Sequence, residues 1–217
     1  MAEYGFLTVE ILYFIFGIIT ILTTIKNWKM NKNRMLIAVT VYISSVLVRS
    51  IIDMGVYALG FDIDITVAGG LDIGMIMGFI LFTIQLEFMF YLMDLPKLYT
   101  LPVIITTYLM MGKILVDSNT PFIMYAMITG YGSAFFLIRD GRKSRNGLAI
   151  GMGLFFLFWG LGSTFQVEIL FVSLRLVAMI ALFLGTRGFY EKYVFVNVEE
   201  EQKIMGTWIA KLVVKDQ

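Results

Sequence analysis

The sequence predicts an all-α integral membrane protein, a bundle of seven transmembrane helices with its N-terminus outside and its C-terminus in the cytoplasm. Three observations predict this fold class. The 217 residues are 59% hydrophobic and only 15% charged, which is more apolar than a soluble domain can bury in one core. The apolar residues fall into seven segments of transmembrane length. The basic residues of the connecting loops and the tail all fall on one side of the resulting membrane.

The seven apolar segments are separated by polar or turn-forming stretches. They cover residues 4–26, 35–59, 67–93, 99–117, 121–139, 147–163 and 164–187, and each can cross a bilayer at about 1.5 Å of rise per residue. The least distinct break is Gly160-Leu161-Gly162-Ser163-Thr164. We interpret it as a tight turn, because 147–187 is about twice the length of one span. A single very long helix is the alternative.

The positions of Lys and Arg predict the orientation. With seven spans, the basic residues of loops one, three and five and of the C-terminal segment all lie on one side. The opposite side has no basic residue and carries four acidic ones: Glu3, Asp62, Asp64 and Asp117. Basic loops are typical of the cytoplasmic side. An even number of spans would put basic residues on both sides. The pattern therefore predicts a multi-pass protein of the cell membrane.

The chain divides into a seven-helix domain, residues 1–189, and a cytoplasmic tail, residues 190–217. In the tail, apolar residues share one helical stripe: Ile204, Met205, Trp208, Ile209, Leu212 and Val213. Such a stripe indicates a short amphipathic helix on the inner leaflet. The alternative is a helix that docks on a cytoplasmic partner or pairs with a second copy of the chain.

The absence of cysteine and histidine from the sequence excludes several kinds of chemistry. Disulfides, thiolate nucleophiles, the usual zinc sites, haem ligation by imidazole and a Ser-His-Asp triad all need these residues. We expect no cofactor and no resident metal, and nothing in the charge balance of +1 indicates a nucleic-acid partner. An enzyme would have to rely on carboxylates alone and is the least supported class.

Eight ionisable residues fall within the predicted spans, where each costs about 2.5–3.5 kcal/mol at a helix centre. Such residues usually face the interior of the bundle. Seven of them are expected in the outer half or at the midplane: Glu10, Arg49, Asp53, Asp72, Lys113, Glu168 and Arg175. The eighth, Glu87 on the third span, is expected near the cytoplasm. These seven are the candidate ligand- or ion-binding residues, and Glu87 is a candidate inner relay for protons.

Spacing suggests partners for some of these charges. Arg49 and Asp53 lie four apart, so they can pair on one face of the second span. Glu168 and Arg175 lie seven apart, on the same face of the last span. Two interpretations remain open. One is a buried ion-pair network that fixes helix packing; the other is a polar cavity open to the outside that accepts a small ligand or ion.

Two further patterns are weaker. Small residues repeat at spacings of four in Gly70, Gly74 and Gly78 and again in Gly147 and Gly151, which predicts close helix packing. The segment Val9-Glu10-Ile11-Leu12-Tyr13 is also similar to Val167-Glu168-Ile169-Leu170-Phe171. In so biased a composition, chance explains this similarity, and it does not indicate a duplicated half.

The layout resembles that of heptahelical receptors and of the seven-helix sensing regions of prokaryotic signalling proteins, in architecture and not in any motif. A retinal protein would need a lysine on the last span, which has Arg175 instead. The resemblance implies a receptor-like sensor that acts through its cytoplasmic tail with a partner protein. The alternatives are a small oligomeric ion or proton transporter or channel, and a structural or assembly subunit of a membrane complex.

Overall fold

The computed structural model describes residues 2–32, 34–59, 66–67, 71–93, 95–116, 118, 120–164 and 168–195. This part of the chain is almost entirely helical. Its α-helices are α1 (Ala2–Asn31), α2 (Arg34–Leu59), α3 (Ile73–Leu92), α4 (Leu101–Val116), α5 (Thr120–Ser144), α6 (Gly147–Thr164), α7 (Glu168–Thr186) and the short α8 (Phe189–Tyr193). A 3-10 turn, η1 (Pro96–Leu98), precedes α4, and two short strands precede α3. The predicted all-α fold is confirmed.

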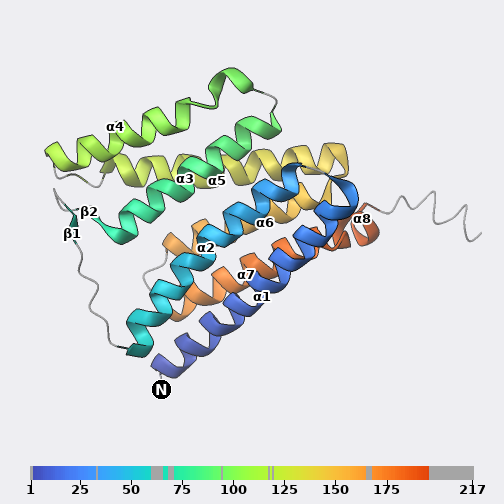
Figure 1. Cartoon of the computed structure of the whole chain (residues 1–217), viewed down its shortest axis with the longest axis horizontal. Helices are drawn as coiled ribbons and strands as arrows, with labels where there is room; N and C mark the ends of the chain where they lie inside the picture. The colour runs from blue at the N-terminus through green and yellow to red at the C-terminus, as the bar shows by residue number, and fades with distance from the viewer. Residues whose placement is uncertain are drawn as a thin grey trace, which may run out of the picture.

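The helices α1 to α7 run back and forth between two ends of the molecule (Figure 1). The chain starts at one end, and α8 lies at the other. Helix α6 packs between α5 and α7, α7 also packs on α1, and α1 packs on α2. Helix α3 contacts α2, α4 and α5, and α4 has its few contacts with α3 and α5.

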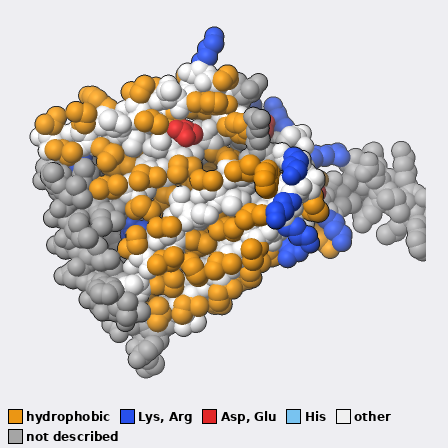
Figure 2. Space-filling view, in the orientation of Figure 1, with side chains coloured by type: hydrophobic (Ala, Val, Ile, Leu, Met, Phe, Trp, Pro, Cys, Tyr) orange, Lys and Arg blue, Asp and Glu red, His pale blue; other side chains and the backbone are white. Residues whose placement is uncertain are grey.

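Three helical segments are long and apolar enough to cross a membrane, judged by length and composition: Gly5–Asn31, Pro96–Val116 and Ile169–Thr186. Three shorter apolar helical segments accompany them: Leu36–Ile52, Met75–Tyr91 and Gly147–Gly162. Large apolar side chains point outwards, such as Leu115, 79% exposed, and Ile128, 70% exposed. Apolar side chains cover much of the face in Figure 2. This composition indicates a membrane location, because lipid is the solvent in which such a surface is favourable.

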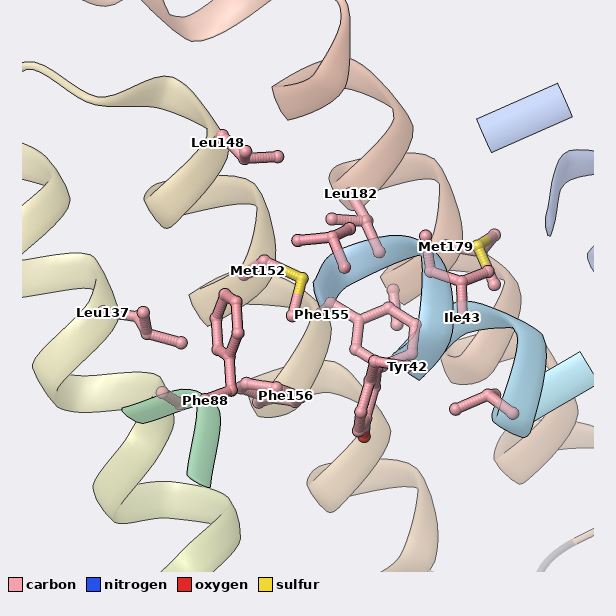
Figure 3. Close-up of a cluster of buried hydrophobic side chains, with 14 of the residues drawn as sticks. Tyr42, Ile43, Phe88, Leu137, Leu148, Met152, Phe155, Phe156, Met179 and Leu182 are labelled. Carbon is pink, nitrogen blue, oxygen red and sulfur yellow. The ribbon is translucent and has the colours of Figure 1, made fainter. Parts of the chain in front are cut away.

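The core is an aromatic and aliphatic cluster drawn from α1, α2, α3, α5, α6 and α7, and Figure 3 shows part of it. At its centre the ring of Tyr42 meets Phe155 and Phe156 edge to face, with centroid distances of 5.8 Å and 5.2 Å. Edge-to-face rings at this separation are a favourable aromatic geometry. Met179 and Leu182 of α7 complete the cluster and are fully buried. The core thus holds α2 and α6 against α7.

Glycines allow α6 to approach its neighbours closely. A Cβ on Gly151 would lie 3.0 Å from Gly185 Cα and 3.1 Å from the carbonyl oxygen of Ala181, both on α7. A Cβ on Gly153 would meet the backbone of α5 at Ile138, 3.0 Å away. The close packing predicted from Gly147 and Gly151 is therefore confirmed, with α7 as the neighbour of Gly151. In the run Gly70, Gly74 and Gly78, Gly70 and the surroundings of Gly74 lie outside the described residues, so close packing along this run stays a prediction.

Two predicted helix boundaries are wrong. The expected turn at residues 160–164 is helical, since α6 continues to Thr164 and α7 begins at Glu168. The segment 147–187 nevertheless forms two helices, as predicted, and not the single long helix of the alternative. Gly162 lies in this last turn because α7 is close there, with Phe171 O 3.2 Å from where its Cβ would be. The glycines therefore serve packing and do not end the helix.

The third span begins later than predicted. Residues 66–67 (β1, Thr66–Val67) pair antiparallel with residues 71–72 (β2, Leu71–Asp72), with Thr66 opposite Asp72. The β-branched Thr66 and Val67 favour a strand, and the glycine pair that follows is a poor start for a helix. Asp72 therefore lies on β2, immediately before α3, and not inside the third helix as expected. The predicted amphipathic helix of the tail lies outside the described residues.

Candidate functional site

A buried ion pair joins α1 to α7. Arg175 Nη2 lies 3.2 Å from Glu10 Oε1, and the two side chains are 1% and 0% exposed. Glu10 is in the first half of α1, and Arg175 is two turns into α7. Ions removed from water in this way need compensating contacts, because the loss of hydration costs several kcal/mol for each ion.

Ser50 of α2 supplies one such contact. Its hydroxyl donates a hydrogen bond of 2.6 Å to Glu10 Oε1, the same oxygen that faces Arg175. Ser50 is itself fully buried. A short hydrogen bond from a hydroxyl to a charged oxygen is among the stronger ones in proteins. Glu10 therefore links three helices, α1, α2 and α7.

Two aromatic rings surround the other ion. The Arg175 guanidinium lies 4.7 Å from the ring centroid of Tyr13 and 5.1 Å from that of Phe171. Tyr13 is one turn from Glu10 on α1, and Phe171 is one turn from Arg175 on α7, so each ring shares a helix face with an ion. Ring faces attract a desolvated cation, and a planar guanidinium stacks on them better than an ammonium would. We call Glu10, Tyr13, Ser50, Phe171 and Arg175 the α1–α7 cluster.

The other predicted site residues fall in different places. Arg49 is half-buried on α2, next to Ser50 in sequence. Lys113 is buried on α4, which lies on the opposite side of the bundle from α1 (Figure 1). The side chains of Asp53, Asp72 and Glu168 lie outside the described residues, so the predicted partners of Arg49 and Arg175 on their own helices stay predictions. Lys113 is thus separated from the α1–α7 cluster.

A second polar group lies among α3, α4 and α5. The hydroxyls of Thr83 and Thr106 lie 2.5 Å apart, and Thr106 is 3.1 Å from the hydroxyl of Tyr125. One turn further along, Gln85 Nε2 donates a hydrogen bond of 3.1 Å to the carbonyl oxygen of Thr129. Glu87, the candidate relay, is half-buried on the same helix as Gln85.

Two hydroxyls in this region lack a hydrogen-bond partner among the described residues. They belong to Thr129 and Ser133 of α5, which are 1% and 2% exposed and lie one turn apart. Elsewhere in the bundle such hydroxyls bond to the carbonyl one turn back, as Thr20 and Ser44 do. A buried hydroxyl without a partner costs about 1–3 kcal/mol. These two hydroxyls are therefore unsatisfied polar groups in the interior of the described bundle.

Three contacts hold α8 and the opposite end of α7. The Tyr190 hydroxyl of α8 donates to the carbonyl oxygen of Ala181 at 3.1 Å, and burial raises the pKa of that hydroxyl. The Glu191 carboxylate accepts a hydrogen bond of 2.7 Å from the backbone N–H of Gly147, the first residue of α6. Asn27 of α1 donates to Thr186 O at 2.7 Å. An anion at a helix N-terminus is favourable, and α8 is thereby fixed to α6 and α7.

Sequence reasoning found both ions of the α1–α7 cluster but not their pairing. It missed Ser50 and the two rings. The signal that could have found the rings is the similarity of residues 9–13 to residues 167–171, because Tyr13 and Phe171 are its equivalent aromatic positions and both face Arg175. The pairing of α1 with α7 is the step that sequence spacing within one helix cannot give.

Within the described residues, no group of three acidic side chains lies close enough together to hold a metal ion. The α1–α7 cluster is instead a buried ion pair with a hydrogen bond and two aromatic rings around it. Comparison of this chain with protein-family models, with curated proteins and with solved structures gave no match.

Proposed function

We propose that the chain is a seven-span, receptor-like membrane sensor, in which a small ligand or ion opens the contact between α1 and α7 and α7 carries the change to α8 and the tail. The single observation that carries this proposal is the fully buried ion pair between Glu10 and Arg175. A buried ion pair can act as a two-state element. When it is intact, each ion offsets the lost hydration of the other, and when it is broken, buried charges are left without a partner at a high cost in free energy.

The arrangement of the helices supports seven spans with the N-terminus outside. All seven longer helices alternate between the two ends in Figure 1, and most of the visible Lys and Arg side chains gather at the end that carries α8 (Figure 2). By the positive-inside rule this end is cytoplasmic. Glu10 and Arg175 then lie in the half of the bundle that is nearer to the outside.

The contacts of α8 support transmission through α7. Arg175 lies in the outer half of α7, whereas Tyr190 and Asn27 hold its other end. A shift of α7 that follows loss of the ion pair would strain the contacts of α8. The part of the tail beyond α8 would pass the change to a cytoplasmic protein or to a second copy of the chain.

A transporter is the second candidate, and the observation that favours it is the buried polar group on α3, α4 and α5. Gln85, Thr129 and Ser133 could line a path for protons or small cations in the inner half, with Glu87 beside them. Flux measurements on proteoliposomes separate the two proposals. A proton or cation flux that Glu87→Gln abolishes would favour the transporter, and its absence under every imposed gradient would favour the sensor.

Single-cysteine labelling tests the proposed spans, and the absence of native cysteine makes each label specific. Residues 97, 145 and 193 should react with a membrane-impermeant maleimide only from the cytoplasmic side, and Ser118→Cys only from the outside. Reaction of Ser118→Cys and Arg145→Cys from the same side would overturn the proposed topology.

Hydrogen–deuterium exchange tests the proposed transmission. Glu10→Gln should accelerate backbone exchange over residues 187–195, because α7 is no longer held to α1 at its outer end. Glu87→Gln is the matched control, since it makes the same chemical change on α3, outside the α1–α7 cluster. Equal exchange at residues 187–195 in wild type and Glu10→Gln would contradict the sensor proposal.

A further inference from the structure

A cavity of about 220 Å³ opens between the last turns of α3 and α5, at the end of the molecule that carries α8. Met89 lies in the last turn of α3 and Met93 immediately follows that helix, and the C-terminal part of α5 contributes the remaining lining residues: Phe136, Leu137, Arg139, Asp140 and Lys143. None of these residues belongs to the α1–α7 cluster, and the proposed function leaves the cavity without a role.

The lining is divided into an apolar and a charged part. Met89 and Leu137 are buried and form the apolar floor. Met93 and Phe136 are 46% and 42% exposed, so apolar surface continues from the floor to the outside. Arg139 and Lys143 lie one turn apart on α5, where they share a helix face, and both are exposed. With Asp140 beside them, the described lining carries one more positive than negative charge.

This combination of an apolar part and a basic part in one cavity has two interpretations. Basic residues in the last turn of a helix are common simply because they complement the helix dipole. The helix dipole accounts for Arg139 and Lys143 but not for the adjoining apolar floor or for the partly exposed Met93 and Phe136. A ligand with both an anionic group and an apolar chain accounts for all of them.

We propose that this cavity binds one anionic phospholipid, with the phosphate at Arg139 and Lys143 and an acyl chain along Met89, Met93 and Phe136. Basic pockets between helices at the cytoplasmic side suit anionic headgroups, and the polarizable methionine side chains adapt to a flexible chain. The inference rests on the proposed membrane topology, because it needs this end of the bundle at the depth of the headgroups. The lipid would fasten α3 to α5, where the bundle has few direct contacts.

Native mass spectrometry of the full chain in detergent tests the proposal. Phosphatidylglycerol should bind more tightly than phosphatidylcholine, which has a similar chain and no net charge. The double variant Arg139→Gln/Lys143→Gln should weaken phosphatidylglycerol binding by roughly 30-fold, since each basic side chain contributes about 1 kcal/mol. The matched control is Arg142→Gln/Arg145→Gln, which removes two exposed charges from the same end of α5 outside the cavity and should change binding by less than about threefold.

A third variant separates a lipid from a soluble anion. Met93→Trp fills the apolar part and leaves both basic residues in place, so it should weaken phosphatidylglycerol and leave the binding of inorganic phosphate unchanged. Equal loss in the two charge variants, equal binding of both lipids, or phosphate binding as tight as that of phosphatidylglycerol would each overturn the proposal. Cysteine labelling is an independent test of topology, so the lipid site can fail while the proposed seven spans stand.

Discussion

The carboxylate of Glu10 and the guanidinium of Arg175 lie 3.2 Å apart, although they come from the first and the last of the long helices. The contact closes the bundle between α1 and α7. Ser50 and the rings of Tyr13 and Phe171 compensate the two ions for the water that they lose. Each of these contacts gives a stability prediction.

Removal of one ion should destabilise the protein far more than removal of both. Glu10→Gln or Arg175→Gln leaves a buried charge without its counter-ion, which costs about 3–5 kcal/mol. The double variant Glu10→Leu/Arg175→Met replaces the pair by apolar groups and should cost less than either single variant. Thermal unfolding of the four proteins in detergent measures this. A larger loss in the double variant than in either single variant would contradict the ion pair.

Ser50→Ala should cost about 1.5–3 kcal/mol, because its hydroxyl donates to a charged oxygen. Ser133→Ala is the matched control: Ser133 is equally buried, but its hydroxyl has no hydrogen-bond partner among the described residues. That variant should be neutral or slightly stabilising. Chemical unfolding of both variants checks the difference, and a larger loss for Ser133→Ala would refute the assignment of Ser50 to the α1–α7 cluster.

Gly151→Ala should separate α6 from α7 and cost about 1–3 kcal/mol, since the new methyl group would press on Gly185 and Ala181. Gly112→Ala tests the same exchange in a helix with open space, because nothing lies within 4 Å of the added Cβ. There the better helix propensity of alanine should stabilise by about 0.5–1 kcal/mol. Unfolding temperatures that shift in the same direction for both variants would argue against the close packing of α6 on α7.

Tyr190→Phe should weaken the attachment of α8 by about 1 kcal/mol at neutral pH, through loss of the hydrogen bond to Ala181 O. The raised pKa of the Tyr190 hydroxyl means that the folded state holds this proton more tightly than the unfolded state. Its contribution is therefore complete below the ordinary tyrosine pKa and is lost as the pH rises through the raised one. Exchange at residues 187–195 should increase at alkaline pH in wild type and less steeply in Tyr190→Phe. Identical pH profiles would exclude Tyr190 as the titrating group.

The fold class and the apolar helices could be predicted from the sequence, because hydropathy and helix length depend on local composition. Asp72 shows where that signal fails. Hydropathy averaged over a window does not distinguish a strand from a helix, so β2 was included in the third span. The basic residues from the end of the fifth apolar segment onwards are expected in a loop, yet Arg139, Arg142 and Lys143 belong to α5, which continues to Ser144, since charge alone does not end a helix.

The candidate site was predictable only in part. A charge in an apolar segment identifies Glu10 and Arg175 residue by residue, because each is costly in lipid. Their pairing depends on which helices are neighbours, and spacing along the chain does not contain that information. Ser50 carries no comparable cost and therefore no comparable signal.

The position of α8 relative to α1 tests the central claim most directly. Spin labels at Lys29→Cys and Tyr193→Cys, both exposed and at the same end of the bundle, report the distance between α1 and α8. In Glu10→Gln this distance distribution should shift or broaden relative to wild type, whereas in Glu87→Gln it should not. An unchanged distribution in Glu10→Gln would contradict the claim that the α1–α7 contact controls the cytoplasmic end of α7.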